Sequence, residues 1–377
     1  MPPQPPPSST PEAVLLRRLS TIKHIILVLS GKGGVGKSSV SVQLALSLLS
    51  LDPNAKVGLL DVDLTGPSLP RMLGLQGHDV HASEDGWIPV YLDLRQRPDG
   101  GDRSKPKRQD LDTSPFGQGG YLAAMSIGFL LSDASESVVW RGPKKNAMIK
   151  QFLGQVRWGT LDYLIVDTPP GTSDEHISLL ESLRPLLLPP LPNALPLPTL
   201  SSLLVSTPQA LALLDVSKEL SFIRRTELPL LGLIENMSGY VCPHCSEIVG
   251  VFGQGGAEDF CRQQEEKKGS LVEGEGGGCR FLGRVPIDRE LVSLLDQVKD
   301  LRVVVEAPLG LGKGKAVGQK EGEGEDERMQ TGPEKDHAQP IKGTTLVDRY
   351  KAIPSFPIVE KIAREVVALI QQQKRTA

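Results

Sequence analysis

An octet near the N-terminus, residues 31–38, constrains the fold of this chain more than any other stretch. It reads Gly-Lys-Gly-Gly-Val-Gly-Lys-Ser and fits G-x-x-x-x-G-K-[ST], the pattern of a phosphate-binding loop. The preceding residues 25–29 are apolar and rich in β-branched side chains, which predicts a buried strand, and residues 40–49 predict a helix. A strand, a glycine-rich loop and a helix in this order are the context that the motif requires.

The residue types of this loop suit it to hold a polyphosphate. Its glycines let backbone N–H groups turn toward the phosphates without side-chain clashes, and the helix N-terminus adds a favourable dipole. We expect Lys37 to reach the β- and γ-phosphates and the Ser38 hydroxyl to hold Mg²⁺. The predicted nucleotide-binding residues of the loop are Gly31, Lys32, Gly33, Gly34, Val35, Gly36, Lys37, Ser38 and Ser39.

Composition excludes several classes of protein. A net charge of −3 over 377 residues gives no strong attraction to nucleic acid or to an anionic membrane. Four cysteines in a chain of this length do not make a disulfide scaffold. The apolar stretch 186–204 is interrupted by five prolines and is therefore a poor membrane span. The proline-rich start resembles no targeting sequence, so we expect a cytoplasmic protein that binds neither nucleic acid nor membrane.

The order of the remaining patterns predicts an α/β fold. Further buried strands are expected at residues 57–60, 121–126, 161–166, 203–206 and 230–234, and helices at 146–153, 208–220 and 257–264. This alternation favours a mainly parallel, doubly wound sheet with helices on both faces.

The same patterns divide the chain into parts. They are a disordered, proline-rich tail over residues 1–20 that ends in a short helix, a P-loop ATPase domain over 21–303 with insertions at 95–120 and 186–200, a low-complexity linker over 304–344, and a C-terminal helix over 345–377 that packs on the domain.

Acidic residues follow two of the predicted strands. Asp61 and Asp63 form a D-x-D pair directly after one strand, where open α/β sheets bind ligands. One of them can support Mg²⁺ and the other can orient an attacking water, although acids in a solvated loop would give the same pattern. Asp167 follows an apolar strand, as in a Walker B motif, and is expected to bind Mg²⁺. Residues 168–174 would then sense the γ-phosphate, with Gly171 as a pivot.

A C-x₂-C pair, Cys242 and Cys245, is the second chemical feature. It follows a strand and a predicted turn over residues 236–240, and it places two thiolates where they can grip one metal centre. Two thiolates are half of a tetrahedral zinc site or of a [4Fe–4S] cluster. A single-chain Cys₄ zinc site with Cys261 and Cys279, a redox pair and free thiols are the alternatives. The simplest interpretation is that a two-fold dimer brings two such turns together.

These motifs together resemble a known family. The extra lysine of the loop, Lys32, resembles the deviant Walker A group of dimerising NTPases, in which this lysine contacts the partner's nucleotide. The whole set resembles the Mrp/Nbp-type iron–sulfur cluster carrier ATPases, and within them the short cytosolic branch of Cfd type. The motifs that carry the resemblance are residues 32–39, 61–68, 140–144, 167–174 and 236–245.

The resemblance implies a function and partners. Such proteins are ATPases that hold a bridging [4Fe–4S] cluster with Cys242 and Cys245 of each subunit and pass it to apoproteins. By the same resemblance, Lys32, Lys37 and Asp63 would be catalytic, Asn236 would recognise the purine base, and residues 283–288 would line its pocket. The expected partners are a longer paralogue with an N-terminal cysteine cluster, in a hetero-tetramer, and downstream Fe–S targeting proteins and apoproteins.

Two other functions account for part of the sequence. A nucleotide-switch NTPase with a structural zinc knuckle would use the same cysteines without transferring a cluster. A positioning ATPase of the MinD type shares the loop, but it leaves the C-x₂-C pair unexplained. Its membrane-binding terminal helix would also have to be the C-terminal helix here, whose balanced charge favours packing on the domain.

Overall fold

The structure of the chain is a computed structural model. It describes residues 10–64, 66–78, 80–83, 86–93, 119–130, 142–188, 196–242, 244–245, 247–253, 255–269, 278–296, 303–304, 315–316 and 345–376. The predicted insertion at 95–120 and the predicted linker at 304–344 lie almost entirely outside these ranges, as do Trp140 and Arg141 of one motif.

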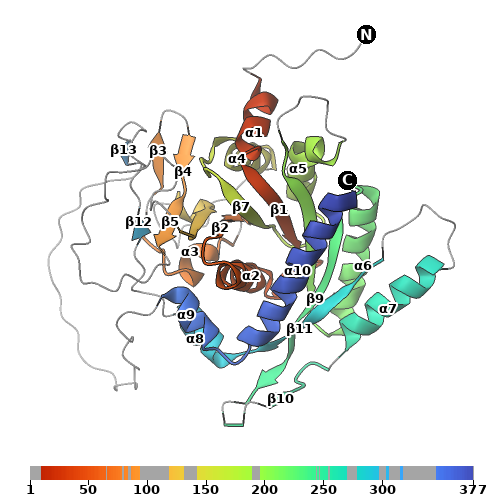
Figure 1. Cartoon of the computed structure of the whole chain (residues 1–377). Helices are drawn as coiled ribbons and strands as arrows, with labels where there is room; N and C mark the ends of the chain where they lie inside the picture. Colours follow the sequence, from red (N-terminus) through yellow and green to blue (C-terminus); the bar gives the residue numbers. More distant parts are fainter. Residues whose placement is uncertain are drawn as a thin grey trace, which may run out of the picture.

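A ten-stranded sheet in the order β10-β9-β8-β1-β7-β2-β6-β5-β12, with β11 also paired to β9, forms the centre of the molecule (Figure 1). The pairs from β9 through β8, β1, β7 and β2 to β6 are parallel, as is β9–β11, whereas β5, β10 and β12 pair antiparallel. The strands are β1 (Ile22–Leu29), β2 (Lys56–Asp61), β5 (Val90–Asp93), β6 (Tyr121–Ser126), β7 (Leu161–Asp167), β8 (Thr199–Ser206), β9 (Leu230–Val241), β10 (Ile248–Val249), β11 (Phe281–Ile287) and β12 (Val303–Val304).

A second, small sheet lies beside this one and joins β13 (Lys315–Ala316), β3 (His81–Ser83) and β4 (Gly86–Ile88). Two short 3₁₀ turns complete the connections, at Ile127–Phe129 and Arg184–Leu187.

The helices form two groups. One contains α2 (Lys37–Leu51), α9 (Leu346–Lys351) and α10 (Phe356–Thr376), which contact one another. The other contains α1 (Pro11–Leu19), α4 (Gly142–Gln155), α5 (Asp174–Leu183), α6 (Ala210–Arg225) and α7 (Gly256–Gly269), in which α4 contacts α1 and α5, and α6 contacts α7. Helix α8 (Arg289–Asp296) contacts α9 and the short α3 (Leu69–Met72). Strands that are mainly parallel and alternate with flanking helices confirm the doubly wound α/β fold predicted from the sequence.

Helix α2 packs on β1, β2, β7 and β8 and lies beside α10, which packs on β8, β9 and β11 (Figure 1). Nearly every residue from Val40 to Leu49 is buried, which explains why this segment is apolar on all sides instead of along one stripe. The C-terminal helix α10 covers it with a buried apolar face that includes Val359, Ile362 and Val366. This helix packs on the domain, as the sequence predicts. None of the described helices is long and apolar enough to cross a membrane.

One sequence expectation was wrong. Residues 236–240 are not a turn before the cysteine pair, because β9 continues through them to Val241. The Asn-Met-Ser-Gly composition is typical of a turn. The segment nevertheless stays extended, because it pairs with β11 and, at the end nearer the cysteines, also with β10. The irregularity that these residues do cause is a bulge, in which Met237 has φ +55°.

Several boundaries of the observed elements also differ from the predicted ones. Thr199 and Leu200, counted with the insertion at 186–200, begin β8 and pair with β1. The short helix expected before residue 21 is α1, whose Leu19 is buried in the core, so packing begins before residue 21. The first nine residues lie outside the described part of the chain. At the other end, residues 345–376 form two helices, α9 and α10, instead of one.

Candidate functional site

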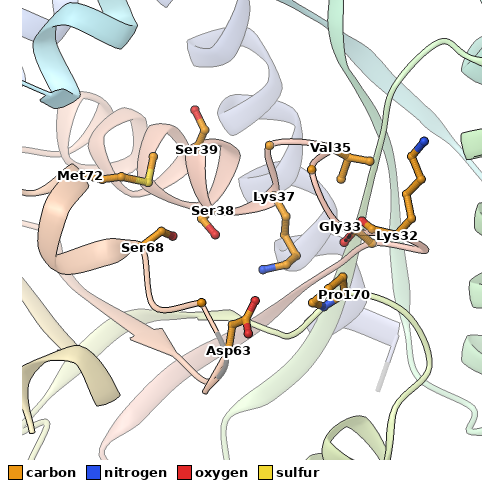
Figure 2. A pocket seen from close by; sticks show the side chains of 14 residues that line it. Lys32, Gly33, Val35, Lys37, Ser38, Ser39, Asp63, Ser68, Met72 and Pro170 are labelled. Carbon is orange, nitrogen blue, oxygen red and sulfur yellow. Dashed lines mark hydrogen bonds between the residues drawn. The ribbon is translucent and has the colours of Figure 1, made fainter. Parts of the chain in front are cut away.

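The predicted phosphate-binding loop connects β1 to α2 and borders a cleft of about 330 Å³ (Figure 2). Gly34 and Gly36 have φ values of +79° and +80°, so the loop adopts a left-handed conformation at two positions where glycine is favoured. The cleft is lined by Ser30, the loop residues Lys32 to Ser39, and Asp63, Gly66, Ser68, Met72 and Pro170. Gly31 lies beside it, where a Cβ atom would come within 2.5 Å of the Asp215 backbone of α6.

A buried hydrogen-bonded cluster lies at the bottom of the loop. Lys37 Nζ is 2.6 Å from Asp167 Oδ1, and the exposed fractions of these side chains are 7% and 0%. Ser38 Oγ donates to Asp167 Oδ2 at 2.5 Å, and Ser41 Oγ donates to Oδ1 at 3.0 Å. The sheet therefore brings together the lysine, the hydroxyl and the Walker B acid that the sequence predicted separately.

The second buried acid, Asp61, ends β2 directly beside Asp167, its partner in the sheet register. It accepts hydrogen bonds from Ser126 Oγ at 3.1 Å and from the Asp63 backbone N–H at 3.0 Å. Complete burial, and then the negative charge of Asp167, raise the pKa of Asp61 to about 8. Two adjacent buried carboxylates and the Ser38 hydroxyl are hard oxygen donors, so this group fits Mg²⁺.

The two remaining predicted catalytic residues lie at the mouth of the cleft. Asp63 and Lys32 both line it and are partly exposed. In Figure 2 the Asp63 carboxylate points toward the Lys37 amine, whereas the Lys32 side chain extends away from Lys37.

The loop after β7 is held by a histidine that sequence reasoning missed. His176 of α5 lies 3.2 Å (Nε2) from Thr168 Oγ1, and its Nδ1 accepts from the Ser173 backbone N–H at 3.4 Å. Burial, and then the positive charge of Lys37, lower the pKa of His176 to about 4, so the ring is neutral. Gly171, with φ +74°, donates its N–H to Ser30 O at 2.7 Å and so ties this loop to the phosphate loop.

Asn236, predicted to read the base, lies directly behind the phosphate loop. Its Nδ2 donates to Val35 O at 2.8 Å, and the residue is 6% exposed. An amide has two N–H groups and one oxygen, so one N–H and Oδ1 are left for a base. Of the residues expected to line the base pocket, Asp288 has both carboxylate oxygens occupied, by the backbone N–H groups of Glu290 and Ser355 at 2.9 Å each.

Cys242 and Cys245 lie in the hairpin that joins β9 to β10, which projects from the bottom of the sheet in Figure 1. Both thiols are free; Cys242 is partly buried and Cys245 is exposed. Hydrogen bonds from the backbone N–H groups of His244 and Cys245 lower the pKa of the Cys242 thiol, which favours the thiolate that a metal needs.

The single-chain zinc alternative is contradicted. Cys261 and Cys279 are buried and lie 3.3 Å apart, sulfur to sulfur, between α7 and the start of β11. No cluster of three or more potential metal ligands of the types His, Cys, Asp or Glu occurs within the described ranges, so the four cysteines do not gather into one site. The exposed pair in the hairpin offers two of the four ligands that a tetrahedral metal site takes.

Comparison with known proteins gives consistent matches. The family profile described as "ParA: NUBPL iron-transfer P-loop NTPase" matches residues 21–96 and 99–309. A cytosolic Fe–S cluster assembly factor, CFD1, from Mycosarcoma maydis is 45% identical over 96% of this chain and 91% of its own length. Human cytosolic Fe–S cluster assembly factor NUBP2 is 47% identical over 75% of this chain and 86% of its own length.

A solved structure is also similar. It is a nucleotide-binding protein from Archaeoglobus fulgidus in complex with ADP, with 31% sequence identity and a TM-score of 0.54. The match covers 76% of this chain and 91% of that one.

Proposed function

The chain belongs to the family of iron-transfer P-loop NTPases, and we propose that it is an ATP-dependent scaffold that assembles a [4Fe–4S] cluster and passes it to apoproteins. Its relatives at 45–48% identity are named cytosolic Fe–S cluster assembly factors, which supports the same role in the cytosol for this chain. The apoproteins that receive the cluster would be cytosolic and nuclear.

The observation that carries the proposal is the contrast between two sites in one chain. The phosphate loop, Asp61 and Asp167 bring the groups that would hold phosphates and Mg²⁺ together within one chain. The hairpin offers two free thiols, and the described residues supply no further ligand beside them. A four-iron cluster takes four thiolates, so two hairpins from two subunits complete the site. The cluster is cargo, and the subunit interface is where it is held.

The nucleotide site has the groups that phosphoryl transfer needs. When a nucleotide binds, Lys37 would release Asp167 and contact the β- and γ-phosphates instead. Asp167 would then be free to join Ser38 and Asp61 around Mg²⁺. The bound ion neutralises charge on the phosphates. Asp63 at the mouth of the cleft would orient the attacking water, and Lys32 would contact the nucleotide of the partner subunit. Asn236 would read the purine base with its remaining N–H and Oδ1.

ATP binding would close the dimer and hydrolysis would open it, and this cycle would change how tightly the hairpins hold the cluster. The proposed partner is a longer paralogue that carries its own N-terminal cysteine cluster, in a hetero-tetramer with this chain. Downstream Fe–S targeting proteins and apoproteins would receive the cargo.

Anaerobic reconstitution with iron and sulfide, followed by iron counting and visible absorption, tests this proposal. We expect about four irons per two chains, the content of one [4Fe–4S] cluster. Cys242→Ala should lose the iron while it still binds Mg·ATP. The matched control is Cys261→Ala, which removes a buried thiol elsewhere and should keep the iron. A colourless protein with about one zinc per chain would instead support the structural-zinc NTPase.

A further inference from the structure

We propose that Asn236 and the bulge that follows it couple the phosphate loop to the cysteine hairpin, so that nucleotide binding changes the exposure of Cys242 and Cys245. This inference rests on the proposed function, because it assigns a route by which nucleotide would control the cargo site. Asn236 acts in it as a positioning residue: through its side chain it holds the loop, and through its backbone it leads into the hairpin.

The first link is the contact between Asn236 and the loop. Its amide donates to the carbonyl of Val35, which lies between the two glycines in left-handed conformation. The packing at this point is tight, since a Cβ atom on Gly36 would lie 2.2 Å from Asn236 Nδ2. A phosphate bound by the N–H groups of the loop would therefore displace or fix the Val35 carbonyl, and Asn236 would follow it.

The second link is that β9 is paired on both sides before Asn236, whereas after Asn236 its pairing is interrupted until Tyr240. Pairing with β8 ends at Glu235, and regular pairing with β11 ends at Asn236. Glu235 is fully buried, and its Oε2 accepts from the Ala257 N–H at the start of α7 at 2.9 Å. A displacement of Asn236 therefore cannot pass back into the core of the sheet. The segment toward the hairpin is the part of β9 that can respond.

The third link is the bulge over residues 237–239. Between the pairs Asn236–Val285 and Tyr240–Ile287, three residues of β9 lie opposite one residue of β11. Met237 has φ +55°, a conformation that is unfavourable for a residue with a side chain and that persists only where the surroundings hold it. Gly239 contacts β10 so closely that a Cβ atom would lie 2.6 Å from Ile248 Cγ2.

These three links join the nucleotide site to the metal-binding hairpin by continuous contacts. The strained bulge is the element that would respond to nucleotide, and the contact between Asn236 and Val35 holds it in the arrangement of this structure. The hairpin begins directly after it, and Cys242 donates its N–H to Glu247 O at 2.9 Å across the base of that hairpin. A change in the bulge therefore tilts β10 and both thiols together.

Thiol alkylation tests this inference on the full-length, cluster-free chain. The rates at which iodoacetamide modifies Cys242 and Cys245 are measured by mass spectrometry of the peptides, with and without a saturating non-hydrolysable Mg·ATP analogue. The buried pair Cys261 and Cys279 serves as an internal reference for unfolding. The affinity for the analogue is measured separately for every variant, so that lost binding is not mistaken for lost coupling.

In the wild-type chain we expect the analogue to change the alkylation rates of the hairpin by about fivefold or more, the lower end of ordinary coupling between sites. Met237→Gly removes the strain at φ +55° but leaves the Asn236 amide in place. It should bind the analogue within about twofold and lose the change in rate. Asn236→Ala should lose the change as well, and Asn236→Gln, which keeps an amide, should restore part of it.

The matched control is Asn54→Ala, the same substitution at an exposed turn, which should behave like the wild type. An unchanged rate in the wild-type chain, or an undiminished change in Met237→Gly and Asn236→Ala, would overturn the inference. The outcome is independent of the proposed cargo. A chain that takes up no iron can still show nucleotide-dependent thiol exposure, and a chain that binds the cluster can lack it.

Discussion

The nucleotide site and the cysteine hairpin lie on one chain but are built in opposite ways. At the bottom of the phosphate loop, Lys37 and Asp167 are 7% and 0% exposed and directly hydrogen-bonded. Around the cysteines, Ile248, Val249 and Phe252 are 41–57% exposed, although they are large and apolar. The buried, paired site is organised by its own fold, whereas the exposed pair of thiols with an apolar rim is the part that we propose another chain completes.

Removing the buried cation of the nucleotide site should have the largest effect on stability and on nucleotide binding. Lys37→Met leaves Asp167 beside Asp61 with no positive charge within the cluster. We expect a loss of about 3 kcal/mol or more in the free energy of unfolding, and an affinity for Mg·ATP reduced by about a hundredfold. Denaturant unfolding and titration with a fluorescent nucleotide measure the two.

The control for this variant is Lys218→Met, which removes an exposed lysine paired with Asp215 and should change stability by less than about 0.5 kcal/mol. Equal losses in the two variants would show that the buried cluster is not what organises the nucleotide site.

Crowding the loop should have the next largest effect. Gly36→Ala places a Cβ atom 2.2 Å from Asn236 Nδ2 at a residue with φ +80°. We expect a loss of about 1–3 kcal/mol in stability and about tenfold weaker nucleotide binding. Gly142→Ala, where a Cβ atom would meet nothing within 4 Å, is the matched control and should bind normally. Normal binding by Gly36→Ala would mean that the loop adapts freely.

The buried histidine predicts a pH dependence for the loop after β7. Its folded pKa of about 4 lies below the ordinary value of 6.5, so between these pH values the unfolded chain binds a proton that the folded chain does not. The contribution of His176 to stability therefore falls as the pH falls through this window, by at most about 3 kcal/mol. His176→Gln, which cannot take up a proton, should remove this contribution.

Other buried groups also change the stability with pH. The prediction therefore concerns the difference in free energy of unfolding between the wild type and His176→Gln. The raised pKa values of Asp61 and Glu219, about 8 and about 7, make their contributions to stability grow as the pH falls. Glu175 behaves like His176 but at lower pH. Burial alone would raise its pKa, but the hydrogen bonds from Lys145 and Ser173 lower it to about 2. If the free energies of unfolding of wild type and variant, plotted against pH, run parallel from pH 7 to pH 5, the assignment is contradicted.

The smallest effect on stability is expected in the hairpin. Cys245→Ser alters an exposed thiol and should change the free energy of unfolding by less than about 0.5 kcal/mol, although it removes a proposed metal ligand. Cys279→Ser, the same change in the buried pair, should cost about 1–3 kcal/mol because it buries a hydroxyl beside Cys261. Chemical denaturation of both variants measures this, and a larger loss for Cys245→Ser would mean that the hairpin is structurally important within one chain.

The sequence predicted the parts whose chemistry is local. The loop octet and the strands before Asp61 and Asp167 follow from patterns within about ten residues of each, and the sheet register then places the acids side by side. Ser126 and His176 were missed because their roles depend on which strand or loop lies beside them. Ser41 alone had a local signal, since it lies one helical turn after Lys37.

Native mass spectrometry of the anaerobically reconstituted protein tests the central claim most directly, because it counts chains and clusters in the same particle. We predict a particle of two chains that holds one four-iron cluster, and single chains without iron when Cys242 and Cys245 are replaced by serine. A single chain that holds a complete cluster or a zinc ion by itself would contradict the account.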